Sequence, residues 1–140
     1  MSYQVRDYST INNPISHWRN IVKKSSNVWY FSNYTHNNFH IEYMREIGLF
    51  IDDKSFFIFK EEKPVAIAIL IFSKDPISNL IQAKFPNDPL PWPIIIDDCE
   101  DRKSVNEIIF NEIHKRIKIN KFSKINFLLN TANYSKEIED

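Results

Sequence analysis

The sequence predicts one α/β (α+β) domain over residues 1–140, with a mixed, twisted sheet and helices on both faces. Three observations predict this class. Residues 55–72 read as an antiparallel hairpin, because two β-rich stretches flank the polar turn Glu61-Glu62-Lys63-Pro64. The second of these stretches, Val65 to Phe72, is apolar throughout, which indicates a central strand buried on both faces. Residues 93–129 read as a β-α-β unit, in which a long helix joins two short parallel strands by a right-handed crossover.

Two helices are expected ahead of the hairpin. Asn13 followed by Pro14 is typical of a helix cap and a first helical residue, and apolar residues then recur at helical spacing as far as Lys24. A second helix is predicted over Thr35 to Leu49, where Gly48 supplies the left-handed exit. The apolar residues expected on the buried face of this helix are Phe39, Tyr43, Met44 and Ile47.

The chain after the hairpin is rich in proline. Residues 73–93 hold five of the seven prolines, so they are expected to form an irregular connection containing a short helix over Ile77 to Ala83. A short buried strand is predicted over Pro93 to Ile96.

The last two elements complete the β-α-β unit. A long helix is predicted over Arg102 to Lys118, with Glu112 and Arg116 as a supporting pair one turn apart. Its buried stripe is expected to be Val105, Ile108, Ile109, Ile113 and Ile117. The final strand is predicted over Lys124 to Leu129.

Composition excludes several function classes. The 18 basic and 18 acidic residues leave no basic excess, which argues against DNA as a partner. The one glycine, Gly48, cannot build a P-loop or a dinucleotide-binding turn. The one cysteine, Cys99, allows no intrachain disulfide, and no apolar run reaches the length of a membrane span. Since no signal peptide is recognised, we expect a cytoplasmic protein whose residues 1–12 and 131–140 are peripheral.

Three stretches carry a resemblance to a known family. They are Asn37 to Tyr43, Phe56 to Lys60 turning into Pro64 to Ala68, and Pro91 to Ile96. Together with the order of elements, they resemble the first part of the GNAT acyltransferase fold over about residues 28–130. Within that fold, the chain looks most like the N-terminal domain of FemAB-type aminoacyl and peptidyl transferases.

The resemblance implies an acyltransferase-like domain that uses neither a bound cofactor nor acyl-CoA. In GNAT enzymes, a glycine-rich, basic turn before the helix holds the pyrophosphate of acyl-CoA. Here the turn is Asp97-Asp98-Cys99-Glu100-Asp101, whose carboxylates would repel pyrophosphate. FemAB-type proteins use an aminoacyl-tRNA donor and pair two such domains. The chain is therefore expected to be half of an enzyme that acts on amino-sugar or peptide acceptors in cell-envelope biosynthesis.

Four residues are nominated for the site of such an enzyme. An amine that attacks an activated acyl group must lose a proton, and His40 or Asp97 is nominated to accept it. Asn37 and Trp92 are nominated as substrate-binding residues in the wall of the groove. Trp92, fixed between two prolines, either forms a recognition ledge or fills the edge of the sheet.

The same residue types also have simpler interpretations. His36 and His40 have a spacing that suits zinc, with His17 or Glu42 as a further ligand, but the two histidines also fit the start and the polar side of a helix. Acids ahead of a helix either bind a cation or cap free amides. Cys99 among acids is a poor nucleophile.

The alternative function is a non-catalytic binding or dimerisation module. Aromatic residues are abundant, and no pair of a nucleophile and a base is recognised. On either hypothesis, an apolar face near Trp29, Phe31 and residues 124–129 is expected to pack on a second GNAT-like domain or on a second copy of the chain.

Overall fold

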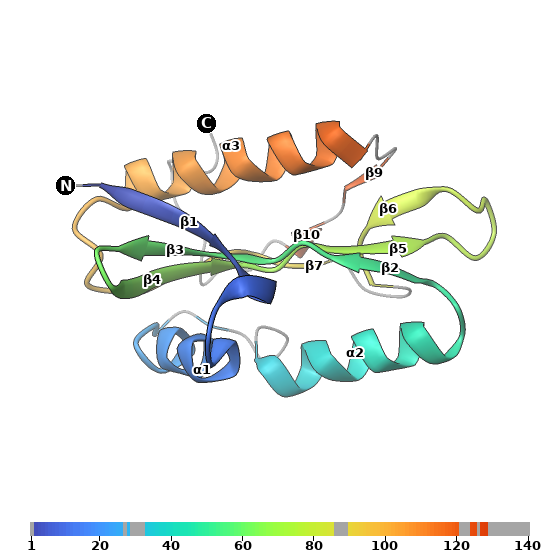
Figure 1. The fold of residues 1–140 in the computed structure, drawn as a ribbon, viewed down its shortest axis with the longest axis horizontal. Helices are drawn as coiled ribbons and strands as arrows, with labels where there is room; N and C mark the ends of the chain where they lie inside the picture. The colour runs from blue at the N-terminus through green and yellow to red at the C-terminus, as the bar shows by residue number, and fades with distance from the viewer. Residues whose placement is uncertain are drawn as a thin grey trace.

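A central sheet lies between helices on both of its faces (Figure 1). In this computed structural model the described residues are 2–26, 28, 33–85, 90–120, 124–125 and 127–128. Helices α1 (Pro14–Lys23) and α2 (Tyr34–Glu46) cover one face, and α3 (Arg102–Asn120) covers the other. The protein is thus a mixed α+β fold, which confirms the predicted class in its coarse form.

The strands form two four-stranded arrays and one further pair. The first array is antiparallel throughout, and its order is β1 (Tyr3–Asp7), β3 (Phe56–Lys60), β4 (Lys63–Ala68) and β8 (Ile94–Ile95). The order of the second is β2 (Phe50–Asp53), β5 (Ile71–Lys74), β6 (Ile81–Ala83) and β9 (Lys124–Ile125), of which only the last pair is parallel. The further pair is parallel and joins β7 (Leu90–Pro91) to β10 (Phe127–Leu128).

The predicted hairpin is confirmed, but its second strand is divided in two. β3 and β4 pair antiparallel, with Phe57 opposite Ile67. The expected continuous strand from Val65 to Phe72 is instead divided into β4 and β5 at residues 69–70. The neighbouring chain has a break between β2 and β3 at the same level, where the Lys54 N–H donates to the Leu70 carbonyl at 2.8 Å. The Leu70 N–H in turn donates to the Ser55 hydroxyl oxygen at 3.0 Å, so hydrogen bonds connect the two breaks.

The fourth position in the sheet holds an interrupted strand. Ala83 of β6 pairs with Phe72, and Ile94 of β8 pairs with Ile67. The chain from Ala83 to Ile94 is therefore longer than the stretch of β4 and β5 that it faces. β7 lies inside this extra length and pairs with β10 instead. The ladder beside β4 and β5 is therefore interrupted between β6 and β8.

Two expectations for this region are corrected. Residues 77–83 were expected to form a short helix, but 81–83 form β6, because Phe72, Ser73 and Lys74 of β5 supply pairing partners. The parallel partner of the last strand is β7, whereas β8 pairs antiparallel with β4. The predicted parallel pair between residues 93–96 and 124–129 is therefore not formed: after α3, β9 pairs parallel with β6 and β10 pairs parallel with β7.

The N-terminal residues are part of the sheet. Residues 1–12 were expected to be peripheral and frayed, yet Tyr3 to Asp7 form β1, the edge strand beside β3. A 3-10 turn over Tyr8–Thr10 follows it. Residues 131–140, as well as Trp29 and Phe31, lie outside the described residues.

The helices bury one predicted face and one unexpected face. In α3 the stripe is confirmed, since Val105, Ile109 and Ile113 are buried. In α2 it is largely wrong: Met44 is buried, but Phe39 is 66% exposed and Tyr43 is 43% exposed. No helix among the described residues is long and apolar enough to cross a membrane.

Candidate functional site

His40 lies beside the interrupted strand. Its ring stacks on Phe85, which follows shortly after β6, with centroids 4.6 Å apart and planes at 14°. The ring of His36, one turn earlier in α2, meets that of His40 edge-on at 4.5 Å. Phe85 is buried and His40 is half-buried, so His40 covers Phe85. Histidine is a common general base, so His40 remains a candidate for that role.

Asn37 is an internal residue of the same helix. Its side chain is 0% exposed, and its Nδ2 donates to the Asn33 carbonyl at 2.8 Å. The Asn33 side chain accepts a hydrogen bond from the His36 N–H at 2.8 Å, which caps the start of α2. In this structure the Asn37 amide therefore orders the first turn of α2.

Trp92 packs on the other face of the sheet. It is half-buried, and its ring lies 5.5 Å from that of Phe110 in α3, at an angle of 51°. His40 belongs to α2, which covers the opposite face (Figure 1). Both residues adjoin the interrupted strand, Trp92 as part of it and His40 through Phe85, but they approach it from opposite faces.

Asp97 holds the end of α1. Its carboxylate accepts a hydrogen bond from the Ser26 N–H at 2.8 Å, and its own N–H donates to the Lys24 carbonyl at 3.1 Å. In the same acidic turn, the Asp101 carboxylate accepts from the Ser104 N–H at 3.3 Å and so caps α3. Glu100 pairs with Lys60 at 3.5 Å. The acidic run therefore has structural partners on three elements.

Among the described residues, no third ligand joins His36 and His40 in a zinc site. Within the described part of the chain, no group of three or more histidine, cysteine, aspartate or glutamate side chains is placed to hold a metal ion. The ring of His17 lies 6.1 Å from that of Phe57 and 5.6 Å from that of Phe59, on the β3 side of α1.

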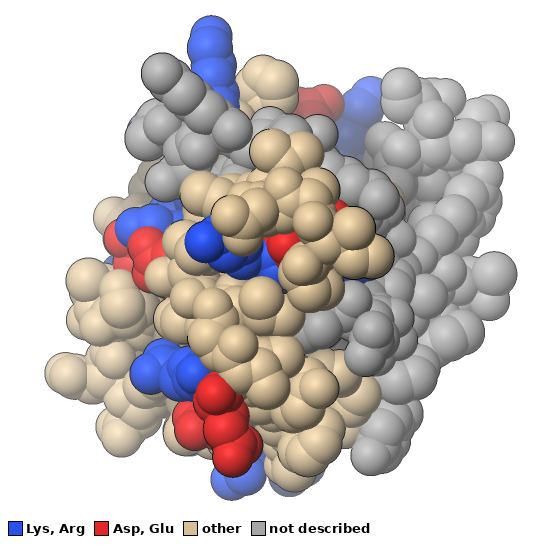
Figure 2. Space-filling view, turned by 90° about the vertical axis from the view of Figure 1, so that its right-hand side faces the viewer, with Lys and Arg blue, Asp and Glu red and all other residues tan. Residues whose placement is uncertain are grey.

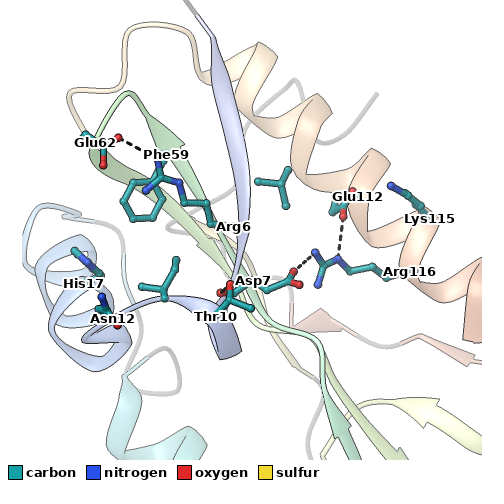
Figure 3. Close-up of a pocket in the computed structure, with 12 residues that line it drawn as sticks. Arg6, Asp7, Thr10, Asn12, His17, Phe59, Glu62, Glu112, Lys115 and Arg116 are labelled. Atoms are coloured by element: carbon teal, nitrogen blue, oxygen red, sulfur yellow. Dashed lines mark hydrogen bonds and ion pairs between the residues drawn. The ribbon is translucent and has the colours of Figure 1, made fainter.

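A second site, which the sequence did not predict, is a groove of about 960 Å³ along the outer side of β1. Figure 3 shows it between α1 on one side and α3 on the other. The lining residues with charge or polarity are Arg6, Asp7, Thr10, Asn12, His17, Glu62, Glu112, Lys115 and Arg116. The alternation of Tyr3 and Val5 with Gln4 and Arg6 is the sequence signal that marks β1.

Most charges in this groove are paired. Arg116 binds both Asp7 and Glu112, the latter at 3.0 Å, while Arg6 lies 3.4 Å from Glu62. The Arg6 guanidinium also sits 4.2 Å above the Phe59 ring. Lys115 lines the groove from α3 and is exposed.

Three groups near the edge of the sheet have shifted pKa values. Burial raises the pKa of Tyr8 to about 12, with Tyr34 and Asp53 adding to the effect. Burial also raises the pKa of Asp53 above the ordinary range, although hydrogen bonds from Ser55 oppose the shift. The pKa of Tyr3 is raised mainly by burial and then by Cys99.

The end of the molecule that contains the β5–β6 turn carries exposed apolar side chains. Figure 2 shows that neutral residues cover much of this end, with acidic and basic side chains in small groups. Exposed apolar side chains at the end of α2, in β2 and around the β5–β6 turn are Ile47, Ile51, Ile77, Leu80 and Ile81.

Comparison of the chain with protein-family models, with curated proteins and with solved structures found no match in any of the three. What the chain does is therefore inferred from its own residues and fold.

Proposed function

We propose that the chain is an acyltransferase-like domain of the GNAT type, similar to the N-terminal domain of FemAB-type transferases. It serves as the acceptor-side half of a cytoplasmic enzyme that modifies an amino sugar or a peptide in cell-envelope biosynthesis. The observation that carries the proposal is the interrupted strand: β7 pairs with β10 while β8 pairs with β4, directly before the crossover helix α3.

The position of this interruption favours a ligand site. In α/β sheets, ligands bind beside the ends of strands where neighbouring connections diverge. Here the strand that contains β7 and β8 turns from one neighbour to the other within a few residues. The element order also supports the proposal, because two helices, a hairpin, further strands, a helix and two short strands follow each other as the resemblance implies. The resemblance did not predict β1 before the helices or β2 before the hairpin.

The turn before α3 argues against acyl-CoA as the donor. Asp97, Asp98, Glu100 and Asp101 are all exposed there. Their charge opposes the attraction of a helix N-terminus for pyrophosphate, and Asp101 already occupies a free amide of α3. An aminoacyl ester, the donor class of FemAB-type transferases, is the donor that fits the resemblance.

The proposed step is aminolysis of that ester. The acceptor nitrogen attacks the acyl carbonyl, the new C–N bond forms, and the ester C–O bond breaks to release the donor hydroxyl. The nitrogen loses one proton, and the leaving oxygen gains one. His40 is the better of the two nominated bases, because its ring adjoins the interrupted strand, whereas the Asp97 carboxylate already accepts from Ser26.

Calorimetric titration tests the proposal. We use glucosamine and a short lysine-containing peptide as probes of the two acceptor classes, and acetyl-CoA as the excluded donor. An acceptor probe should release or absorb heat on binding, and His40→Gln should weaken that binding more than the matched change His36→Gln. Micromolar binding of acetyl-CoA would contradict the exclusion. Absence of heat with both acceptors at millimolar concentrations would contradict the acceptor-side role.

One observation favours the alternative, a binding or dimerisation module. Phe39, Tyr43 and Ile47 recur every four residues along the outer side of α2, with exposed fractions of 66%, 43% and 45%. An apolar stripe of this kind on a helix is typical of a surface that packs against a partner.

A further inference from the structure

We infer that the groove along β1 binds an extended polypeptide segment, which adds to the sheet as a further strand outside β1. This groove is separate from the proposed acyltransferase site, which lies at the interrupted strand on the other side of β3 and β4. Three features of the groove favour such a ligand: the backbone of β1, the walls on both sides of this strand and the charge of those walls.

The backbone of β1 presents hydrogen-bonding groups to the groove. The Tyr8 N–H donates to the Ser55 carbonyl at 3.0 Å, which fixes the phase of the ladder between this segment and β3. Because the ladder alternates, Gln4 and Arg6 also face β3, while the N–H and C=O of Val5 point into the groove. The Asp7 carbonyl points the same way and accepts from the Thr10 hydroxyl at 3.1 Å.

No described residue bonds the outward N–H and C=O of Val5. Unpaired groups on an exposed edge are a template for another strand. Main-chain hydrogen bonds then provide affinity, and side-chain pockets provide selectivity.

The walls of the groove favour a single extended segment over a second copy of the chain. Its walls are Ile11, Asn12 and His17 on the α1 side, and Glu112, Lys115 and Arg116 on the α3 side (Figure 3). Paired strands lie only about 4.8 Å apart. Because the α1 side and α3 flank β1, a single extended segment fits beside this strand more readily than a second copy that brings its own helices.

The walls define the side chains that such a segment needs. Side chains of an added strand alternate between the α1 wall and the α3 wall. The α1 wall offers half-buried Ile11 and His17, which suit an apolar residue. The α3 wall offers exposed Lys115, while Arg116 beside it is already bound to Asp7 and Glu112. The segment is therefore one in which apolar and acidic residues alternate.

Fluorescence anisotropy with a designed peptide tests the inference. The probe is a labelled, amidated peptide in which valine alternates with glutamate. One control peptide replaces glutamate with lysine, and another carries N-methyl groups on the amides that would pair with Val5. We expect the N-methylated peptide to bind about tenfold more weakly or worse, because lost main-chain hydrogen bonds leave backbone groups unpaired. The protein is unchanged in this comparison, so its folding cannot affect the outcome.

Two protein variants complete the test. Val5→Pro removes the outward N–H but no hydrogen bond to β3, and edge strands tolerate proline at such positions. The variant should therefore keep the circular dichroism spectrum of the wild type and lose binding of the peptide. Val5→Thr keeps the N–H and should bind like the wild type. Lys115→Glu should weaken binding of the glutamate peptide about fivefold and strengthen binding of the lysine peptide.

Equal binding of the N-methylated peptide, wild-type binding by a folded Val5→Pro variant, or no binding of the glutamate peptide at millimolar concentration would each overturn the inference. Loss of acceptor binding in the calorimetric test would leave it unaffected, because different residues carry it.

Discussion

Arg116 of α3 donates a hydrogen bond to the carboxylate of Asp7 in β1, a residue 109 positions away in the chain. The same guanidinium binds Glu112 at 3.0 Å and the Lys54 carbonyl at 3.0 Å, and it lies 4.7 Å above the ring of Phe56. One side chain thus connects β1 and the break between β2 and β3 to α3. Its exposed fraction is only 14%, so water screens these contacts weakly.

Replacing Arg116 should therefore destabilise the fold. We expect Arg116→Ala to lower the free energy of unfolding by about 2–3 kcal/mol, because it leaves the half-buried carboxylates of Asp7 and Glu112 without their cation. Urea denaturation followed by circular dichroism measures the change. The neighbouring Lys115→Ala is the control and should stay within about 0.5 kcal/mol of the wild type, since Lys115 is exposed. Equal effects of the two substitutions would contradict the assigned role.

The raised pKa of Asp53 predicts a pH dependence of stability. The folded state holds this proton more tightly than the unfolded state does, so stability falls as the pH rises from the unfolded pKa, near 4, through the folded pKa. Asp53→Asn should remove that loss, because its side-chain oxygen can still accept from the Ser55 N–H, a bond of 2.9 Å. Denaturation midpoints between pH 3 and 7 provide the measurement.

Asp98→Asn removes one carboxylate from the exposed turn before α3, so it is the matched control that isolates the effect of Asp53. If Asp53→Asn were less stable than the wild type at neutral pH, the ionised carboxylate would be the favoured form in the folded protein, which would contradict a raised pKa for Asp53.

The outer stripe of α2 predicts a measurable association if the chain is a binding module. Sedimentation equilibrium at tens of micromolar should then show a dimer, and Phe39→Glu should return it to a species of 16.7 kDa. Glu46→Gln changes an exposed polar residue at the end of the same helix and should leave the dimer intact. A wild-type chain that sediments only at 16.7 kDa would remove self-association from the alternative function.

Local sequence signals predicted the elements better than their faces. In α3 the apolar residues recur at helical spacing, which predicted the buried face of the helix. Val105, Ile109 and Ile113 are buried as expected. In α2 the aromatic residues and the pair Asn37 and Met44 are equally periodic, and only contact with the sheet decides which face is buried.

Interruptions and long-range pairs left weaker signals. No polar residue marks the break between β4 and β5 at residues 69–70, because both residues are buried within an apolar run. The prolines of residues 73–93 argued against a strand there, so β6 was not predicted. Its pairing partners come from β5. The contact between Arg116 and Asp7 depends on the tertiary fold, so the groove along β1 could not be found from spacing.

The most direct test of the central claim is to map where an amine acceptor binds, by following backbone and side-chain resonances in NMR during titration with glucosamine and with the lysine-containing peptide. The proposed site predicts that the largest shifts fall on the His40 ring, on Phe85 and on the amides of β8, beside the interrupted strand. Shifts that leave these residues unchanged, while the acceptor binds elsewhere or not at all at millimolar concentration, would contradict the claim that this strand forms an acceptor site.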